Sequence, residues 1–135
     1  MKVNPYITFN GDCEAAVGFY ENAFGADATI MRYRDAPEGN GYAPPAGTEN
    51  LVMHAQIELG GELIYFCDVP PGYPVTKGDN VAISVAFDCV NCARPAFAAL
   101  SEGGEIKMEL QKTFWSECFG SLTDKFGINW QVTVV

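Results

Sequence analysis

Few residues of this chain can do acid–base chemistry, and the best candidates lie around one histidine. His54 is the only histidine among 135 residues, and it lies in a segment, residues 51–59, where apolar and polar residues alternate. Glu58 falls on the same side of that alternation, where a carboxylate can hold the imidazole tautomer or raise its pKa. We therefore take His54 and Glu58 as the best candidates for catalytic residues. Two other roles stay open for His54: a structural histidine or subunit contact, and a metal ligand.

One pair of cysteines has the spacing of redox and zinc sites. Cys89 and Cys92 form a Cys-x-x-Cys motif, whereas Cys13, Cys67 and Cys118 are isolated. There is no second motif of this kind, so a four-ligand zinc site would have to recruit scattered cysteines. Redox or metal use of the pair is therefore the minor alternative to five free thiols.

Other catalytic signatures are missing from the sequence. Ser84, His54 and Asp124 supply the residue types of a hydrolase triad, but no Gly-x-Ser-x-Gly elbow is present. The phosphate-binding loop and the dinucleotide-binding fingerprint are also absent.

Composition indicates one acidic, folded domain. Hydrophobic residues make up 48% and charged residues 19%, which is typical of a globular domain of this length. The formal net charge of −9 disfavours nucleic acid and anionic membranes as partners, because both require a basic face. No apolar run reaches the roughly 18 residues of a membrane span, and the first residues lack a signal-peptide pattern. We therefore expect a cytoplasmic protein with reduced cysteines.

The hydrophobic pattern predicts helices and strands in a mixed α+β fold. Apolar residues at helical spacing, with Asp12 as N-cap and Gly25 as the closing residue, indicate a first helix. A second helix is expected to begin near residues 91–93, because Pro95 is tolerated only in a first turn. The pair Gly60-Gly61 indicates a tight hairpin. Strands are expected over residues 3–9, 28–33, 51–59, 62–69, 81–88, 105–111, 116–123 and 128–135.

The two halves of the chain repeat each other. Both have the order strand, helix, strand, strand, strand, and four identities fall 78 residues apart at equivalent places. The simplest interpretation is a single domain over residues 1–135 made by duplication, with a first module over about 1–69, a linker over 70–79 and a second module over about 80–135. The identical pairs are Phe9 and Phe87, Ala15 and Ala93, Phe19 and Phe97, and Gly25 and Gly103.

Three stretches of the sequence carry a family pattern. They are Pro-Tyr-Ile-Thr-Phe-Asn-Gly-Asp within residues 5–25, Met-His-Ala to Gly-Gly within residues 53–61, and Leu-Gln-Lys-Thr-Phe-Trp followed by Phe-Gly and Asp-Lys-Phe-Gly within residues 110–130. In these stretches the chain resembles the PhnB-like, or demethylubiquinone methyltransferase-like, branch of the vicinal oxygen chelate superfamily. That superfamily includes glyoxalase I and the bleomycin- and fosfomycin-resistance proteins. The resemblance implies two βαβββ modules whose curved sheets form a cup for a small molecule, commonly in a homodimer.

The resemblance also implies where a catalytic metal would bind, and the residues there are poor ligands. The positions fall near Pro5 or Tyr6, at Ala82 or Ser84, and at Gln131, where the superfamily usually has Glu. Divalent ions prefer anionic or imidazole donors, so we expect neither a metal nor another cofactor. A genuine methyltransferase is not expected either, because no strand is followed by the Gly-rich turn that usually binds S-adenosylmethionine.

The alternation along the strands predicts which residues line the cup. Met53, Ala55, Ile57, Val81, Ile83, Val85, Trp130 and Val132 are expected to face the helices. The opposite face is then expected to bind an unidentified small molecule, roofed by the Gly- and Pro-rich residues 35–50. We expect a binding protein without chemistry of its own; the alternatives are an enzyme (lyase, isomerase or transferase) acting on a small substrate in the same cup, and an interaction subunit of a larger assembly. The predicted ligand-binding residues are Tyr6, Thr8, His54, Gln56, Ser84 and Gln131.

Overall fold

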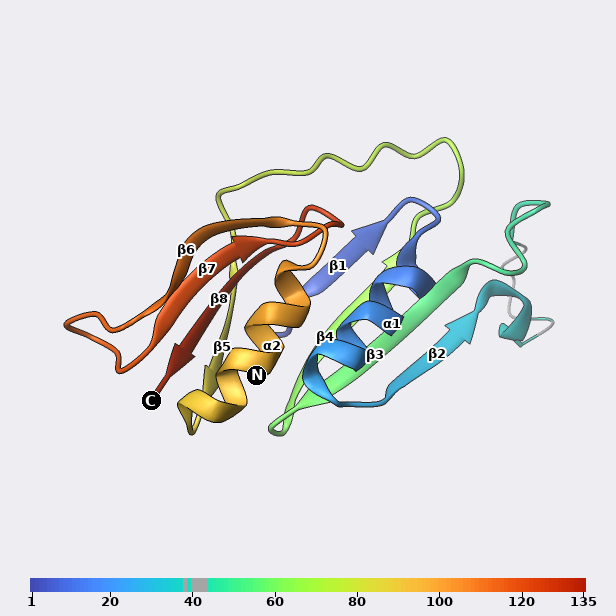
Figure 1. Cartoon of the computed structure of the whole chain (residues 1–135). Coiled ribbons are helices and arrows are strands. Elements are labelled where there is room, and N and C mark those ends of the chain that lie inside the picture. Colours follow the sequence, from blue (N-terminus) through green and yellow to red (C-terminus); the bar gives the residue numbers. More distant parts are fainter. Residues whose placement is uncertain (38, 40–43) are drawn as a thin grey trace. The chain divides into compact units, whose positions relative to one another are not determined.

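The chain folds as two units of the same design. The computed structural model describes residues 1–37, 39 and 44–135. Contacts divide it into Met1–Val75 (unit 1) and Thr76–Val135 (unit 2), a boundary that falls inside the predicted linker. Among the described residues, each unit has one α-helix and one four-stranded mixed sheet, in the order strand, α-helix, strand, strand, strand (Figure 1). The predicted α+β fold of two βαβββ modules is confirmed.

Unit 1 places its first strand beside its last. The strand order is β1-β4-β3-β2, with β1 parallel to β4 and the other pairs antiparallel. Gly60 and Gly61 make the β3–β4 hairpin turn, and both have positive φ, as the sequence predicts. The elements are β1 (Tyr6–Phe9), α1 (Cys13–Phe24), β2 (Ala28–Arg32), the short 3-10 helix η1 (Tyr33–Asp35), β3 (Val52–Leu59) and β4 (Glu62–Asp68).

Unit 2 repeats this arrangement with the order β5-β8-β7-β6. Strand β5 is parallel to β8, and the other neighbours are antiparallel. The elements are β5 (Ile83–Phe87), α2 (Val90–Ser101), β6 (Glu105–Gln111), β7 (Phe119–Thr123) and β8 (Asn129–Val134). No helix of the described chain has the length and apolar character needed to cross a bilayer.

Each helix buries an apolar stripe against one face of its own sheet. In unit 1 the Tyr20 ring stacks on Phe66 with centroids 5.6 Å apart, and Phe66 also stacks on Phe9. In unit 2 the buried residues of α2 are Ala93, Ala96, Phe97 and Leu100, and the sheet contributes Leu122, Trp130 and Val132. The helix of each unit thus covers one face of its sheet and leaves the other face free of contact with that helix.

Two helix-end predictions for α1 are confirmed, and the one for the start of α2 differs from the structure. Gly25 ends α1 in the left-handed conformation, with φ of 63°, as expected. Helix α2 begins at Val90 rather than near residues 91–93, so Pro95 lies in its second turn. The prediction for Pro95 is wrong because burial of the apolar stripe outweighs the single hydrogen bond that proline cannot donate. Asp12 is the N-cap residue of α1, as predicted, although its side chain makes no capping hydrogen bond.

The helix-facing set also needs two corrections. A register shift pairs Met31 with His54 and Arg32 with Val52, which leaves Met53 as the extra residue of a bulge. Val52, rather than Met53, is therefore buried against the helix together with Ala55 and Ile57. The prediction that Met53 faces the helix is wrong. Val81 precedes β5 and is 72% exposed, so it does not pack beneath a helix either.

The first turn of α1 is capped by a residue distant in sequence. Asp68, at the end of β4, is 2% exposed. Its Oδ1 accepts hydrogen bonds from the backbone N–H of Gly11 (2.8 Å) and Cys13 (3.1 Å), and its Oδ2 accepts one from Val52 N–H at 3.0 Å. One buried carboxylate thus joins the β1–α1 turn and the start of β3 to β4.

Replacing this carboxylate is expected to destabilise the protein far more than replacing the local cap residue. Asp68→Asn puts an amide N–H where an acceptor is needed, leaving a buried donor unsatisfied, and should cost about 2–4 kcal/mol of unfolding free energy. Asp12→Ala is the matched control and should cost less than about 0.5 kcal/mol, since that side chain caps nothing. Urea unfolding of both variants measures the difference; equal losses would contradict the role of Asp68.

Candidate functional site

Three aromatic side chains meet on the face of the unit 1 sheet opposite α1. Tyr6, Tyr65 and His54 come from the adjacent strands β1, β4 and β3. The Tyr6 hydroxyl lies 3.1 Å from His54 Nδ1, within hydrogen-bond distance. Ring centroids are 5.7 Å apart for Tyr6 and Tyr65 and 5.1 Å for His54 and Tyr65, with edge or tilted geometry. We call these three residues the aromatic cluster.

Strand register explains why these side chains meet. Tyr6 pairs with Tyr65 across the parallel β1–β4 ladder, and Gln56 pairs with Tyr65 across β3–β4. Paired residues point to the same face, and so do residues two apart in one strand, which adds Thr8 and His54. Four of the predicted ligand-binding residues, Tyr6, Thr8, His54 and Gln56, therefore share one face of unit 1.

The hydroxyl and thiol of this face are held in their neutral forms. Desolvation, followed by the neighbouring Cys67, raises the pKa of Tyr6 to about 12. Burial likewise raises the pKa of the Cys67 thiol. Tyr6 is nevertheless 52% exposed, so a ligand can reach its ring. Tyr6 and Cys67 therefore offer a neutral hydroxyl and a neutral thiol to this face rather than a phenolate or thiolate.

Glu58 is not the partner of His54. It pairs with Leu63 and lies four residues along β3 from His54, about 13 Å at the usual rise of a strand. The ring nitrogen of His54 is held by Tyr6 instead. The expected pairing of His54 with Glu58 is thus corrected: the hydrogen-bond partner of His54 Nδ1 is a phenol on another strand.

Ser84 and Gln131 lie together, but in unit 2. They are register partners in the parallel β5–β8 ladder, so they share the face opposite the buried Trp130 and Val132. Ser84 is exposed and Gln131 partly buried. The structure thus groups the predicted ligand-binding residues by unit, four on the unit 1 sheet and two on the unit 2 sheet.

The predicted roof, residues 35–50, lies partly outside the described residues, which exclude 38 and 40–43. Its two ends are joined by backbone hydrogen bonds from Tyr33 N–H to Leu51 O and from Arg34 N–H to Glu49 O, each 3.1 Å. Near its end Thr48 is fully buried, and its hydroxyl donates to Pro45 O. Its role as a roof stays a prediction.

The residues at the superfamily's metal positions do not suit a divalent cation. Tyr6 holds its proton, and Ser84 and Gln131 contribute only neutral oxygen or nitrogen atoms. Across residues 1–37, 39 and 44–135, no group of three or more His, Cys, Asp or Glu side chains is placed to share a metal ion. We therefore derive no chemistry through a bound metal.

Sequence reasoning missed Tyr65 and Cys67. Their signal was available in the hairpin: once Gly60-Gly61 joins β3 to β4, the register places Tyr65 beside Gln56. Cys67 pairs with Thr8 of β1, the strand that neighbours β4 on the edge away from β3. Both residues thus add to the face that carries His54.

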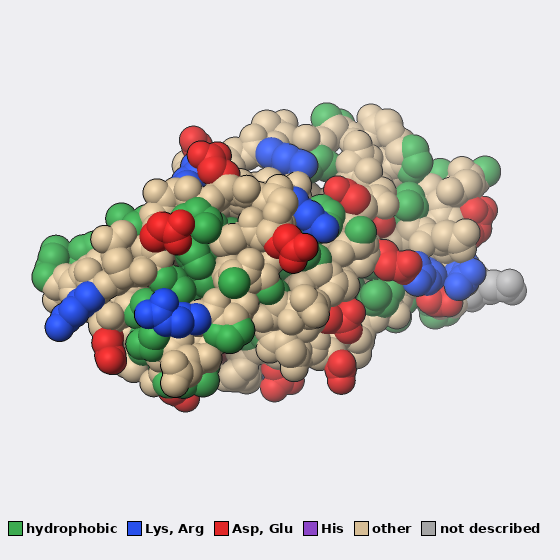
Figure 2. Space-filling model, in the orientation of Figure 1, with side chains coloured by type: hydrophobic (Ala, Val, Ile, Leu, Met, Phe, Trp, Pro, Cys, Tyr) green, Lys and Arg blue, Asp and Glu red, His purple; other side chains and the backbone are tan. Residues whose placement is uncertain are grey.

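Acidic and basic side chains are interspersed on the face of the molecule drawn in Figure 2. Figure 2 shows the Asp and Glu side chains spread over the face drawn there, with Lys and Arg between them. The net charge of −9 is therefore not gathered into one acidic patch on that face.

Comparison with known proteins gives the family. Residues 2–132 match the model of the glyoxalase/bleomycin resistance protein/dioxygenase superfamily, and the chain belongs to this superfamily. It is 28% identical to protein YjdN of Escherichia coli K12, over all of this chain and 96% of the relative.

Two solved structures support the PhnB-like branch. Protein PA1353 from Pseudomonas aeruginosa is 33% identical, with a TM-score of 0.86 over 99% of this chain and 97% of that one. A Bacillus cereus PhnB protein, described as a putative 3-demethylubiquinone-9 3-methyltransferase, is 28% identical, with a TM-score of 0.79 over all of both chains.

The tautomer of His54 is expected to depend on Tyr6. A phenol is a good donor to a neutral imidazole, so we expect Tyr6 Oη to donate to Nδ1, leaving the proton on Nε2. Tyr6→Phe removes this donor and should shift the population toward the Nδ1–H form. Because the chain has one histidine, ring ¹⁵N NMR at neutral pH reads the tautomer without assignment variants. Identical spectra for Tyr6→Phe and the wild-type protein would contradict the hydrogen bond.

Proposed function

We propose that this protein binds a small molecule on the polar face of unit 1, through the aromatic cluster and the neighbouring Thr8 and Gln56. The observation that carries the proposal is the Tyr6 Oη to His54 Nδ1 contact of 3.1 Å. When Tyr6 donates to Nδ1, Nε2–H is left as a donor whose direction is fixed by the two neighbouring tyrosine rings. Few convergent polar groups beside aromatic surface are typical of small-molecule sites.

The chemistry of the cluster favours one class of ligand. The Tyr6 and Tyr65 rings offer flat apolar surface, and Nε2–H offers a donor to a carbonyl or other acceptor oxygen. A molecule with a planar part and an acceptor next to it fits these groups. Neutral hydrogen-bonding groups can recognise such a molecule without transforming it, and this supports a binding protein over an enzyme.

The test uses the full-length protein and two substitutions in β3. Thermal shift against a metabolite library, with bleomycin included because the superfamily carries its name, identifies a ligand, and calorimetry measures its Kd. His54→Ala should weaken that Kd about tenfold, the loss of roughly one hydrogen bond and a ring contact, while leaving the melting temperature nearly unchanged. Glu58→Gln, on the same strand but away from the cluster, should bind like the wild type.

The outcomes separate the alternatives. An unchanged Kd in His54→Ala would remove this site from the proposal, and unfolding of that variant would favour the structural role of His54. The same measurement on Ser84→Ala and Gln131→Ala tests whether the unit 2 residues contact the same ligand.

The second candidate function is an enzyme acting on a small substrate, with His54 as general base. It requires the other tautomer, in which Nδ1–H donates to Tyr6 Oη and Nε2 is free to accept a proton. A dominant Nδ1–H signal in the ¹⁵N spectrum, together with loss of the ligand during incubation, would favour this alternative. Transfer of a methyl group from S-adenosylmethionine is not proposed, since neither four-stranded sheet is the doubly wound sheet that usually binds it.

Metal-independent binding is a separate prediction. Protein purified without chelators is expected to hold less than a stoichiometric amount of zinc, nickel or manganese, because the donors at the superfamily positions are neutral. Elemental analysis measures the metal content, and about one ion per chain would contradict the prediction.

The proposal has three further parts. The two units pair into one domain, the protein assembles into a homodimer, and its location is cytoplasmic.

A further inference from the structure

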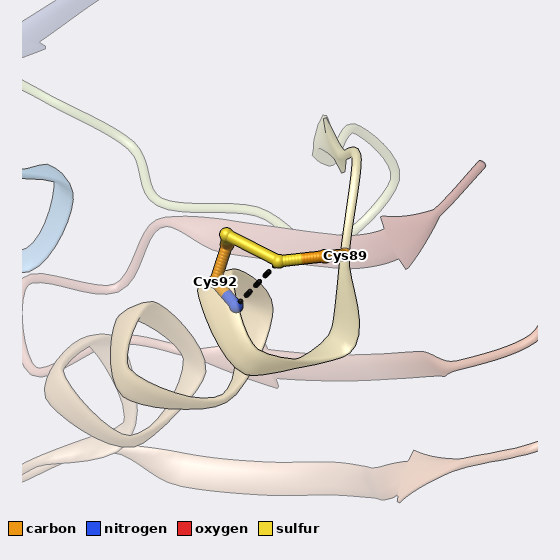
Figure 3. The surroundings of a disulfide bond; sticks show 2 residues. All are labelled: Cys89 and Cys92. Carbon is orange, nitrogen blue, oxygen red and sulfur yellow. Dashed lines mark hydrogen bonds between the residues drawn. A yellow bond between two sulfur atoms is a disulfide. The ribbon is translucent and has the colours of Figure 1, made fainter.

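We propose that Cys89 and Cys92 form a reversible dithiol–disulfide site at the start of α2, a redox function beyond the proposed binding. The structure joins the two sulfur atoms in a disulfide, with Cα atoms 5.4 Å apart (Figure 3). Cys89 is the N-cap residue of α2, with extended backbone, and Cys92 lies in its first turn. The expectation of five free thiols is therefore wrong for this pair.

The cap interaction supplies the chemistry of an attacking thiol. The backbone N–H of Cys92 donates a hydrogen bond to Cys89 Sγ at 3.2 Å (Figure 3). When the bond is reduced, the same N–H and the positive end of the helix stabilise a thiolate on Cys89. Cys92 follows three residues later, within reach of the Cys89 sulfur, and acts as the resolving thiol.

Accessibility separates this pair from the two buried cysteines, Cys13 and Cys118. Cys92 is exposed and Cys89 partly exposed. Cys13 is 0% and Cys118 3% exposed, and burial raises the pKa of Cys13 far above its usual value. A disulfide exchange partner therefore reaches Cys89 and Cys92 but not these two thiols.

The bond contributes little to holding the fold together. It closes a loop between residues only three apart, so it removes little entropy from the unfolded chain. Helix α2 is held instead by its buried residues, including Phe97 and Leu100. A disulfide that is exposed, short in span and unnecessary for folding is suited to repeated opening and closing.

The exchange is balanced with a small-molecule disulfide such as oxidised glutathione. The Cys89 thiolate attacks one sulfur of the oxidised glutathione, so a mixed disulfide forms and one glutathione thiolate leaves. The Cys92 thiolate then attacks Cys89 Sγ, which forms the Cys89–Cys92 bond and releases the second glutathione thiolate. Two electrons pass from the protein to glutathione, and the two protons of the protein thiols end on the two glutathione products.

The first experiment equilibrates the full-length protein in buffers of varied reduced and oxidised glutathione. After acid quenching and alkylation with a maleimide, intact mass and peptide mapping count the labelled cysteines. Cys89 and Cys92 should gain labels together, in one two-electron transition. Labelling of the pair in the most oxidising buffer, or no labelling with excess dithiothreitol, would overturn the proposal.

Single-cysteine variants test the roles within the pair. Cys92→Ser should form a stoichiometric mixed disulfide at Cys89 with oxidised glutathione at pH 7. Cys89→Ser keeps a good helix cap in serine, so it should fold, and its Cys92 should react several-fold more slowly. Equal or faster reaction in Cys89→Ser would overturn the assignment of Cys89 as the attacking thiol.

Two controls separate redox chemistry from structure. Cys67→Ser changes a partly buried thiol of unit 1 and should leave the transition of the pair unchanged. The melting temperatures of the oxidised and reduced wild type should agree within a few degrees; loss of the folded state on reduction would identify a structural crosslink and overturn the proposal. None of these readouts depends on the ligand of unit 1.

Discussion

The geometry of unit 1 depends on one buried carboxylate. Asp68 accepts three backbone hydrogen bonds, from Gly11, Cys13 and Val52, and its residue is only 2% exposed. It stands at the end of β4, beside the start of α1 and the start of β3. The three strands β1, β3 and β4 supply Tyr6, His54 and Tyr65, so the carboxylate that joins their ends also positions the aromatic cluster. A one-residue slip in any of these ladders would turn a ring of the cluster toward α1.

Unit 2 also has a buried carboxylate that accepts three hydrogen bonds, but it lies in a different turn and has different partners. Asp124, in the β7–β8 turn, is 3% exposed and accepts hydrogen bonds from the N–H of Phe126 and Ile128 and from the Trp130 indole. In the repeat, the register pair Ser84 and Gln131 takes the place that Tyr6 and Tyr65 take in unit 1. The backbone pattern is thus common to both units, whereas the side chains that could meet a ligand are not.

Local signals in the sequence were sufficient for the elements and insufficient for their long-range contacts. Gly25 and the Gly60-Gly61 turn were predictable because each requires positive φ in a short segment. The cap of α1 was not, because Asp68 is 55 residues from Cys13 and no local pattern distinguishes it from the nearer Asp12. The bulge at Met53 was hidden for a similar reason: apolar residues at both Val52 and Met53 fit either face, and only the pairing with β2 decides between them. The Tyr6 to His54 contact, 48 residues apart, likewise needed the sheet order.

The raised pKa values of Tyr6 and Cys67 limit what this face can do. A phenol whose pKa is raised to about 12 and a thiol whose pKa is also raised give up protons reluctantly, so neither acts as a nucleophile or an anionic ligand at neutral pH. The face can still orient a hydrogen-bonding group toward a ligand. Tyr6 holds one ring nitrogen of His54, and Tyr65 packs against the imidazole ring and limits its rotation. Such a site discriminates between ligands by where their acceptor atoms lie, because a buried donor left unpaired costs more than a hydrogen bond gains.

The reactive sulfur proposed here lies elsewhere, on Cys89 at the start of α2, where a helix N–H and solvent both reach it. Ligand binding is thus assigned to unit 1 and redox chemistry to unit 2. A substitution that abolishes one of these functions is expected to leave the other intact.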